Sequence, residues 1–201
     1  ITAKTKSAFT NSDQEIIKDF MNSCEYYDWV VNSYTKYQYS ITRNKSQLCP
    51  HTTIHKFIGY ENSHTKYVPS KIFSEPLKNI SAFLGSYFAC DGTVSINRKR
   101  NTVVCEYYSV SKKLLQDVQS LLTRFGVFSR LGEKNATYKD SPHKSYRLVI
   151  GGQDVVTFAK NIRVVGEKRL LLEEAIDILS DKDKSVSYHN YVPNGWQKHL
   201  K

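Results

Sequence analysis

An internal duplication constrains the fold of this chain more than any other feature of its sequence. The order strand, helix, strand pair, irregular stretch and Tyr-Val-Pro occurs twice along the 201 residues. A sequence that repeats in this way predicts two structural units of the same kind. The matching segments are Phe9–Ile17 with Tyr107–Leu115, Asp19 with Asp117, Tyr37–Ile41 with Tyr146–Ile150, and Tyr67–Pro69 with Tyr191–Pro193.

We place the first repeat at residues 1–75 and the second at residues 76–201. In the first repeat, Ser12 and Glu15 have the spacing of a capping box, which predicts the start of a helix. Residues 43–66 are polar and predict no regular structure. Strands are expected at residues 1–10, 29–31 and 36–42. The inward face of the first helix is expected to consist of Ile16, Ile17, Phe20, Met21 and Cys24.

In the second repeat, short apolar runs predict strands, and apolar residues at helical spacing predict helices. Gly126 is expected to end the helix that contains Leu114 and Phe125. Strands are expected at residues 93–96, 102–108, 127–131 and 146–150. Further helices are expected to open at residues 151–154 and to span residues 167–180. Polar links are expected at residues 97–101 and 132–144.

The stretch Phe83–Gly92 lies near the start of the second repeat and is apolar until its last two residues. On a helix its small side chains share one face, on which another helix can approach closely. We expect Gly92 to supply the permissive residue at the C-terminus of this helix. Asp91 would then project from the end of a helix pair, although an ordinary buried helix with an Asp-Gly turn is the alternative. The small residues are Gly85, Ser86, Ala89 and Cys90.

Leu84–Gly92 resembles the signature of the LAGLIDADG homing endonucleases. Tyr67–Phe73 and Asp117–Gly126 look like the members of that family that occur inside inteins. The resemblance implies an α+β fold of two αββαββα units, whose antiparallel, saddle-shaped sheets lie on the DNA major groove. It also implies that the two signature helices pack together at a pseudo-twofold axis, with Gly85, Ser86, Ala89 and Cys90 at the helix interface.

The first repeat departs from this family pattern because it begins at its strand. We therefore expect its signature helix, with a second acid, to lie elsewhere in a larger endonuclease or on a second polypeptide. The sequence opens with Ile1 and does not finish in His-Asn, which predicts that it is not a complete intein. We accordingly expect the chain alone to bind DNA better than it cuts it.

Hydrolysis of a phosphodiester requires an activated water, neutralised phosphate oxygens and help for the leaving group. The resemblance implies that Asp91 is the catalytic acid and that Asp91 and Gly92 hold Mg²⁺ or Mn²⁺. The negative end of the helix dipole would also favour a cation there. A basic or polar group that follows the paired strands should assist. The candidates are Lys45, Arg43 and Gln153, for each of which a solvated loop residue is the alternative.

The formal net charge of +10 favours a polyanionic partner, and fourteen tyrosines favour nucleic acid among such partners. Double-stranded DNA contacts are expected from the outward positions of the sheets and their turns, although a solvated basic surface is the alternative. Arg and Asn can bind base edges, whereas Lys mainly binds phosphate. One cluster is Ser95, Asn97, Arg98, Lys99 and Arg100, and the other is Arg130, Lys134, Lys139, Lys144 and Arg147.

Other site types receive less support from the sequence. The four cysteines show no Cys-x-x-Cys spacing, so we expect reduced thiols in an intracellular protein. A zinc site at Cys49, His51, His55 and His64 would lack a second ligand pair, so a polar loop is the alternative. No apolar run approaches the ~20 residues that span a bilayer, and no signal peptide follows Ile1.

The expected function is therefore site-specific, divalent-metal-dependent cleavage of double-stranded DNA, by a homing endonuclease or an intein-embedded endonuclease domain. The alternative is a catalytically degenerate LAGLIDADG domain or maturase that binds DNA or RNA without cutting it. Metal-dependent nicking of a cognate duplex distinguishes these two. A third class, a basic protein-interaction domain, predicts no salt-dependent affinity for nucleic acid.

Overall fold

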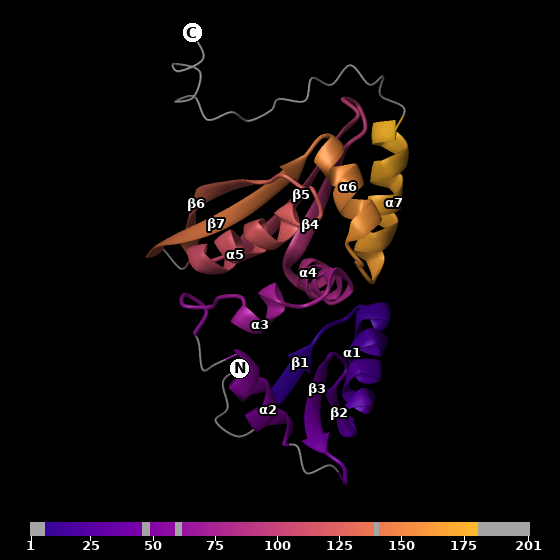
Figure 1. Ribbon diagram of the computed structural model, residues 1–201, viewed down its shortest axis with the longest axis vertical. Helices are drawn as coiled ribbons and strands as arrows, with labels where there is room; N and C mark the ends of the chain where they lie inside the picture. The colour runs from indigo at the N-terminus through magenta and orange to yellow at the C-terminus, as the bar shows by residue number, and fades with distance from the viewer. Residues whose placement is uncertain (1–6, 46–48, 59–61, 139–140, 181–201) are drawn as a thin grey trace.

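The computed structural model describes residues 7–45, 49–58, 62–138 and 141–180. They form two units, each built on an antiparallel sheet, which lie one above the other along the long axis of the molecule (Figure 1). The α+β class and the antiparallel sheets that the sequence predicts are thereby confirmed. The expected Tyr191–Pro193 repeat lies outside the described residues.

The first unit has a three-stranded sheet in the order β1-β3-β2, with β1 at Ser7–Thr10, β2 at Trp29–Thr35 and β3 at Gln38–Arg43. Helix α1 (Gln14–Tyr26) packs against β2, and the Phe20 ring stacks on Phe9 of β1 at 4.1 Å between centroids. Met21 is 39% exposed, contrary to its expected inward position. Three short strands cover only part of the apolar helix face.

Two other expectations for the first unit are wrong. The cap of α1 is Asp13 and not Ser12, because the Asp13 carboxylate accepts hydrogen bonds from the backbone amides of Glu15 and Ile16. Helix α2 (Pro50–Ile58) occupies part of the stretch 43–66 for which no regular structure was expected. Pro50 suits the first position of a helix, but the polar Thr and His residues that follow it hide the short apolar pattern.

The second unit has a four-stranded sheet in the order β4-β5-β7-β6, with its helices packed on one face (Figure 1). The order β5-β7-β6 repeats the order β1-β3-β2 of the first sheet, as the duplication predicts. The strands are β4 (Gly92–Asn97), β5 (Thr102–Ser109), β6 (Arg130–Tyr138) and β7 (Ser141–Gly151). The helices are α4 (Leu77–Asp91), α5 (Lys112–Thr123), α6 (Gln153–Asn161) and α7 (Glu167–Ser180).

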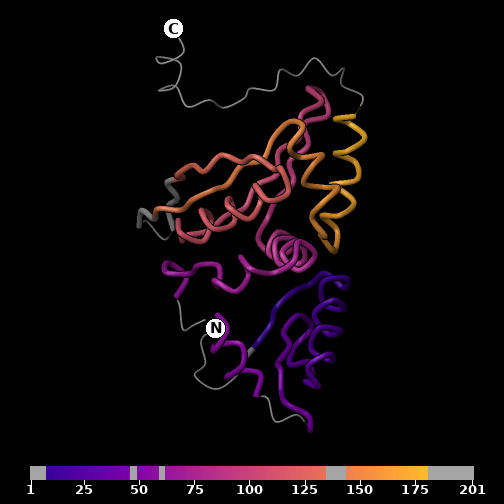
Figure 2. Tube along the Cα trace, in the orientation of Figure 1, coloured from indigo at the N-terminus to yellow at the C-terminus, as the bar shows by residue number. Residues whose placement is uncertain are grey.

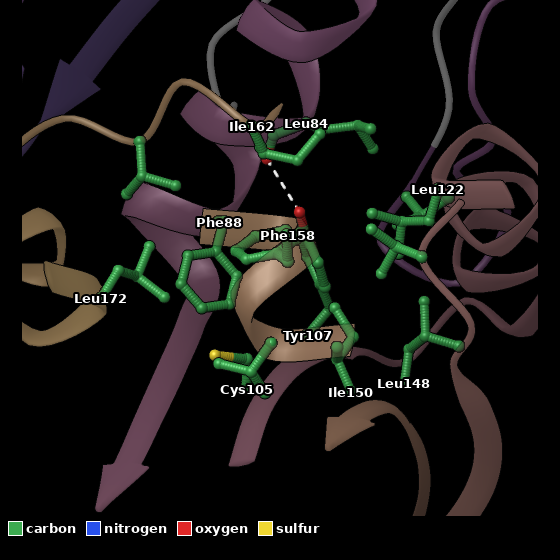
Figure 3. Packing of buried hydrophobic residues seen from close by; sticks show 14 of the residues in the cluster. Leu84, Phe88, Cys105, Tyr107, Leu122, Leu148, Ile150, Phe158, Ile162 and Leu172 are labelled. Atoms are coloured by element: carbon green, nitrogen blue, oxygen red, sulfur yellow. Dashed lines mark hydrogen bonds between the residues drawn. The ribbon is translucent and has the colours of Figure 1, made fainter. Parts of the chain in front are cut away.

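A large apolar core joins these helices to the sheet (Figure 3). Phe88 of α4 makes edge contacts with Tyr107 of β5 and Phe158 of α6, at 5.0 and 4.9 Å between ring centroids. Such edge-to-face pairs add to the gain from burial. The buried Tyr107 hydroxyl donates to the Leu84 carbonyl at 3.0 Å. This core fixes α4, and therefore Asp91, relative to the sheet.

Two element boundaries in the second unit differ from those predicted. Strands β6 and β7 extend through most of the stretch 132–144 that was expected to be a polar link, because β6 is an edge strand and this end of β7 pairs only with β6, where polar side chains are tolerated. The backbone of Gly92 is extended, with φ −87° and ψ 168°, a conformation that any residue can adopt. The conformational freedom of glycine is therefore not required here. A Cβ at Gly92 would instead lie 2.3 Å from Cδ2 of Phe88, which only glycine avoids.

The segment between the sheets packs with the second unit. The short helix α3 (Ser70–Phe73) contributes Ile72 to the core of the second unit, as does Val68 just before it. The Val68 amide donates to the buried Asp117 carboxylate at 3.1 Å, and Arg124 donates to the Phe73 carbonyl at 2.9 Å. Packing thus attaches this segment to the second repeat. The repeat boundary at residue 75 stays a prediction.

The two units meet where the start of α1 approaches the connection between α6 and α7 (Figure 2). Asp13 accepts a hydrogen bond from the Glu167 amide at 2.9 Å, so one carboxylate caps both α1 and α7. Arg163 forms an ion pair with Asp19 at 2.6 Å. No helix in the described part of the chain is long and apolar enough to span a membrane.

Candidate active site and nucleic-acid interface

Asp91 is the last residue of α4, and its side chain is exposed. The carbonyl groups just before it are bonded by Lys168 of α7, whose Nζ lies 3.1 Å from the Phe88 oxygen and 2.6 Å from the Ala89 oxygen. A cation here offsets the partial negative charge of a helix C-terminus. Burial lowers the pKa of Lys168, and the charges of Cys90, Asp91 and Asp13 oppose that shift. Lys168 therefore anchors the end of α4 that carries Asp91.

A hollow of about 430 Å³ lies beside Asp91. Lys66 and Lys134 line it together with Asp91, so an acid and two cations face one space. Tyr87 also lines the hollow and donates its hydroxyl to the Tyr108 carbonyl at 2.9 Å. Burial, followed by the nearby charge of Asp91, raises the pKa of Tyr87 to about 12, which keeps this phenol neutral. The wall therefore combines a neutral, hydrogen-bonded phenol with charged side chains.

Sequence reasoning missed both Lys66 and Lys168. Lys66 directly precedes the first Tyr-Val-Pro, so the repeat itself was the signal that could have found it. Its backbone is fixed, because the hydroxyl of Ser111, the N-cap of α5, donates to the Lys66 carbonyl at 2.5 Å. A lysine in the first turn of a helix is disfavoured by the dipole. Lys168 at the start of α7 therefore signals a partner outside its own helix.

The three expected assisting residues do not line the hollow at Asp91. Arg43 and Lys45 are exposed at and after the end of β3 in the first unit. Gln153 is the exposed first residue of α6, which begins two residues after β7. Their roles stay predictions. The cations that line the hollow beside the candidate acid are Lys66 and Lys134.

The face of small residues on α4 is divided in two. Gly85 and Ala89 are buried within the second unit, and a Cβ at Gly85 would lie 1.8 Å from the Arg163 carbonyl oxygen. The close backbone approach at Gly85 is therefore with the α6–α7 connection. Ser86 and Cys90 are exposed, so they remain accessible to a partner helix. These positions correct the expectation that all four small residues lie together at one helix interface.

The sheet face opposite the helices carries half of the expected DNA contacts, and we call it the open face. Alternation along the strands places side chains of one parity there. It consists of Thr93 and Ser95 of β4, Val104, Glu106 and Tyr108 of β5, Arg130 and Lys134 of β6, and Arg147 and Val149 of β7. Asn97 lies at the far end of the same face, and Lys99 and Arg100 are exposed in the β4–β5 turn.

Two of the expected DNA contacts lie elsewhere. Arg98 donates from Nε and Nη2 to Glu174 of α7 at 2.7 and 3.0 Å, which draws it toward the helices. Lys144 has the parity of the buried Leu148, and so lies on the helix side of β7, 4.0 Å from Glu133. Lys139 lies outside the described residues. DNA binding by all of these residues stays a prediction.

The candidate zinc ligands are spread along and beyond α2. The rings of His51 and His55 lie 4.2 Å apart between centroids, on successive turns of α2. Among the described residues, no group of three or more His, Cys, Asp or Glu side chains is placed to hold a metal ion. Asp91 therefore brings a single carboxylate to its site from this part of the chain.

Comparison with known proteins gives several matches. The replicative DNA helicase DnaB of Synechocystis is 30% identical over 144 residues, which is 70% of this chain and 16% of the helicase. The DnaB of Nostoc is 33% identical over 68% of this chain and 16% of its own length. A DNA gyrase subunit of Mycobacterium kansasii is 31% identical over 64% of this chain and 24% of its own length. The chain thus spans about a sixth to a quarter of these relatives.

A family model describes the same region. Residues 78–163 match the LAGLIDADG-like domain, from the first turn of α4 to the α6–α7 connection. This range holds the Leu84–Gly92 stretch, the whole four-stranded sheet and the acid at the end of α4. Residues 78–163 are therefore similar to a LAGLIDADG-like domain, as the signature stretch indicates.

Proposed function

We propose that this chain binds duplex DNA across the open face and hydrolyses a phosphodiester next to Asp91. The observation that carries this proposal is the hollow in which Asp91, Lys66 and Lys134 face one space at the edge of the open face. A phosphate that enters it would meet a carboxylate and two cations. The remaining cations of the open face would bind neighbouring phosphates and bases.

The comparisons support a module that is carried by different host proteins. A helicase, a translation initiation factor and a gyrase share sequence with this chain although their names denote different activities. The shared part is 16%, 11% and 24% of those three proteins. A segment that recurs in unrelated hosts is expected of an intein-embedded endonuclease.

The donor set at Asp91 suits Mg²⁺ or Mn²⁺ in part. Mg²⁺ commonly takes one or two protein carboxylates and completes its shell with waters and phosphate oxygens. Asp91 would supply the carboxylate, with the Gly92 backbone beside it. Such an ion, when bound, would polarise the phosphate and acidify a water. Further oxygen ligands would come from DNA and from a second acid.

The protein groups have separate tasks in this proposal. Lys66 would neutralise charge on the phosphate oxygens, because its backbone is held by Ser111 and its side chain lines the hollow. Lys168 would hold the end of α4 so that Asp91 keeps its position. Tyr87 would stay neutral and bonded to Tyr108, and would limit water on the inner wall.

The accessible side of α4 would receive a second signature helix. Ser86 and Cys90 are small and exposed there, and Cys90 directly precedes Asp91. A helix that ends in Asp-Gly and packs on this side would bring its acid close to Asp91. It could belong to a longer form of the protein or to another polypeptide.

The test is a cleavage assay against a library of long duplexes with Mg²⁺, with and without an added segment that ends in a second Asp-Gly signature. We expect the added segment to produce double-strand cleavage, Asp91→Asn to abolish it while binding persists, and Lys66→Gln to slow it. Lys160→Gln, at an exposed position of α6, is the charge-matched control and should cut normally. Salt-dependent binding without cutting in every arm would favour the degenerate binding domain. Robust double-strand cutting by residues 1–201 alone would show that the site is misplaced.

A further inference from the structure

Glu106 is an acidic side chain at the centre of the open face. Its side chain is only 13% exposed, although it lies on a surface otherwise lined by neutral and basic groups. Oε2 of Glu106 accepts a hydrogen bond from the Tyr108 hydroxyl at 2.6 Å, and Oε1 accepts one from Nη1 of Arg147 at 3.3 Å. A carboxylate here would repel DNA phosphates, so its presence calls for a function in recognition.

We propose that Glu106 determines specificity by holding Arg147 in position to read a guanine base, which rests on the proposed binding of DNA at the open face. A guanidinium carries five N–H donors, and the bond to Glu106 uses a donor on Nη1. Donors therefore remain for the O6 and N7 acceptors that guanine presents in the major groove. Because the arginine is fixed before DNA arrives, binding costs less side-chain entropy.

The strand register leaves Arg147 accessible from the DNA side. Arg147 pairs with Tyr108 on one side and with Gly132 on the other. A Cβ at Gly132 would lie 3.9 Å from both Cγ and Nε of Arg147, in ordinary van der Waals contact, so glycine here places no side chain against the arginine. The Arg147 side chain is 44% exposed. It is thus tethered at one nitrogen and open toward a ligand.

The position of this pair also indicates where the guanine lies. Tyr108, which bonds Glu106, also lines the hollow beside Asp91. Thr93, which pairs with Glu106 across β4 and β5, is two residues after Asp91. With a rise of about 3.4 Å per base pair, the guanine read by Arg147 should lie within about three base pairs of the cut phosphate.

The acid would also act against wrong sequences. An untethered arginine can turn to any nearby phosphate, and that contact carries no sequence information. The carboxylate of Glu106 disfavours phosphate in the space around Arg147. Replacing Glu106 by glutamine should therefore tighten binding to unrelated duplexes and weaken the preference for guanine at the same time.

The experiment selects bound duplexes from a library with randomised base pairs, using residues 1–201, and measures the affinity of each variant for a random duplex. Arg147→Ala should lose the guanine preference at one position by roughly 5- to 100-fold, and Arg147→Lys should lose it while its salt dependence persists. Glu106→Gln should reduce the same preference at least about threefold and bind the random duplex more tightly. Tyr108→Phe, which removes the other bond to Glu106, should act in the same direction.

Glu133→Gln is the matched control. It removes the same charge from the same sheet, but Glu133 is paired with Lys144 on the helix side. We expect it to keep the selected sequence unchanged. Equal effects of Glu106→Gln and Glu133→Gln, or an unchanged guanine preference in both Glu106→Gln and Tyr108→Phe, would overturn the inference. Tight wild-type binding without base preference would overturn it and leave the proposed binding intact, whereas no duplex binding would refute the proposed function.

Discussion

Gly85→Ala should destabilise the chain strongly, although alanine is the better helix former. The Cβ would lie 1.8 Å from the Arg163 carbonyl oxygen and 2.5 Å from its carbonyl carbon. Both atoms are backbone, so no side chain can rotate away. Separation of α4 from the α6–α7 connection would also stretch the bonds of the Ser81 hydroxyl, at 2.7 Å to the Asn161 carbonyl and 2.9 Å from the Arg163 amide.

The expected size follows from two opposing terms. The gain in helix propensity from Gly to Ala is about 1 kcal/mol. Overpacking of a well-packed core typically costs 1–3 kcal/mol, and overlap with backbone should bring the loss to about 3 kcal/mol or more. The net loss of unfolding free energy should therefore be about 2 kcal/mol, or a fall in Tm of about 4–8 °C for a chain of this size.

Chemical and thermal denaturation of wild type, Gly85→Ala and Gly151→Ala measures this loss. Gly151 is the matched control, because a Cβ there has no neighbour within 4 Å and its φ is not positive. Gly151→Ala should be neutral or slightly stabilising, since it restricts the unfolded chain. A Gly85→Ala variant as stable as Gly151→Ala would refute the close contact between α4 and the α6–α7 connection.

Three further predictions concern the surroundings of α4. Lys168→Met should lower the unfolding free energy by about 1–3 kcal/mol, because it leaves α4 carbonyls without their donor. Denaturant melts measure this loss, and a loss equal to that of the exposed Lys160→Met would contradict the prediction. Cys90→Leu should change stability by less than about 0.5 kcal/mol in this chain, since Cys90 is exposed; a Tm fall like that of Gly85→Ala would show a hidden seam. Burial raises the pKa of Asp13, but amide hydrogen bonds from Glu167, Ile16 and Glu15 outweigh it and leave the pKa below 3.8. Its contribution to stability is therefore present above pH 3.8 and is lost as the pH falls through the lower folded pKa. Asp13→Ala should remove that part of the acid dependence, and an unchanged pH profile would argue against the double cap.

The apolar periodicity predicts α4, α5 and α7 well, because those helices bury a regular apolar face. The same reasoning fails at Gly92, since an Asp-Gly turn and a helix that runs directly into a strand look alike in sequence. What excludes larger residues there is the Phe88 ring, which a sequence pattern does not reveal. The sequence likewise does not show which small residues of α4 are buried and which are exposed, because that depends on the position of Arg163.

The candidate site was predictable where one residue carries it and not where distant segments meet. Asp91 follows from the signature stretch alone. Lys66 and Lys168 come from segments that lie 25 and 77 residues from Asp91 in the sequence. Only the hydrogen bonds of their backbones and side chains with α5 and α4 place them near the acid. The assisting residues expected from strand ends instead lie outside this hollow.

The duplication explains how both lysines reach Asp91. In the alignment of the repeats, the N-cap Ser111 and Asp117 of α5 correspond to the N-cap Asp13 and Asp19 of α1. The α5 pair binds the Lys66 carbonyl and the Val68 amide, which brings Lys66 to one side of the acid. The α1 pair binds the Glu167 amide and Arg163, which sets the start of α7 and so directs Lys168 to the end of α4. The helix start of each repeat thus performs the same task, and the positions of Lys66 and Lys168 depend on it.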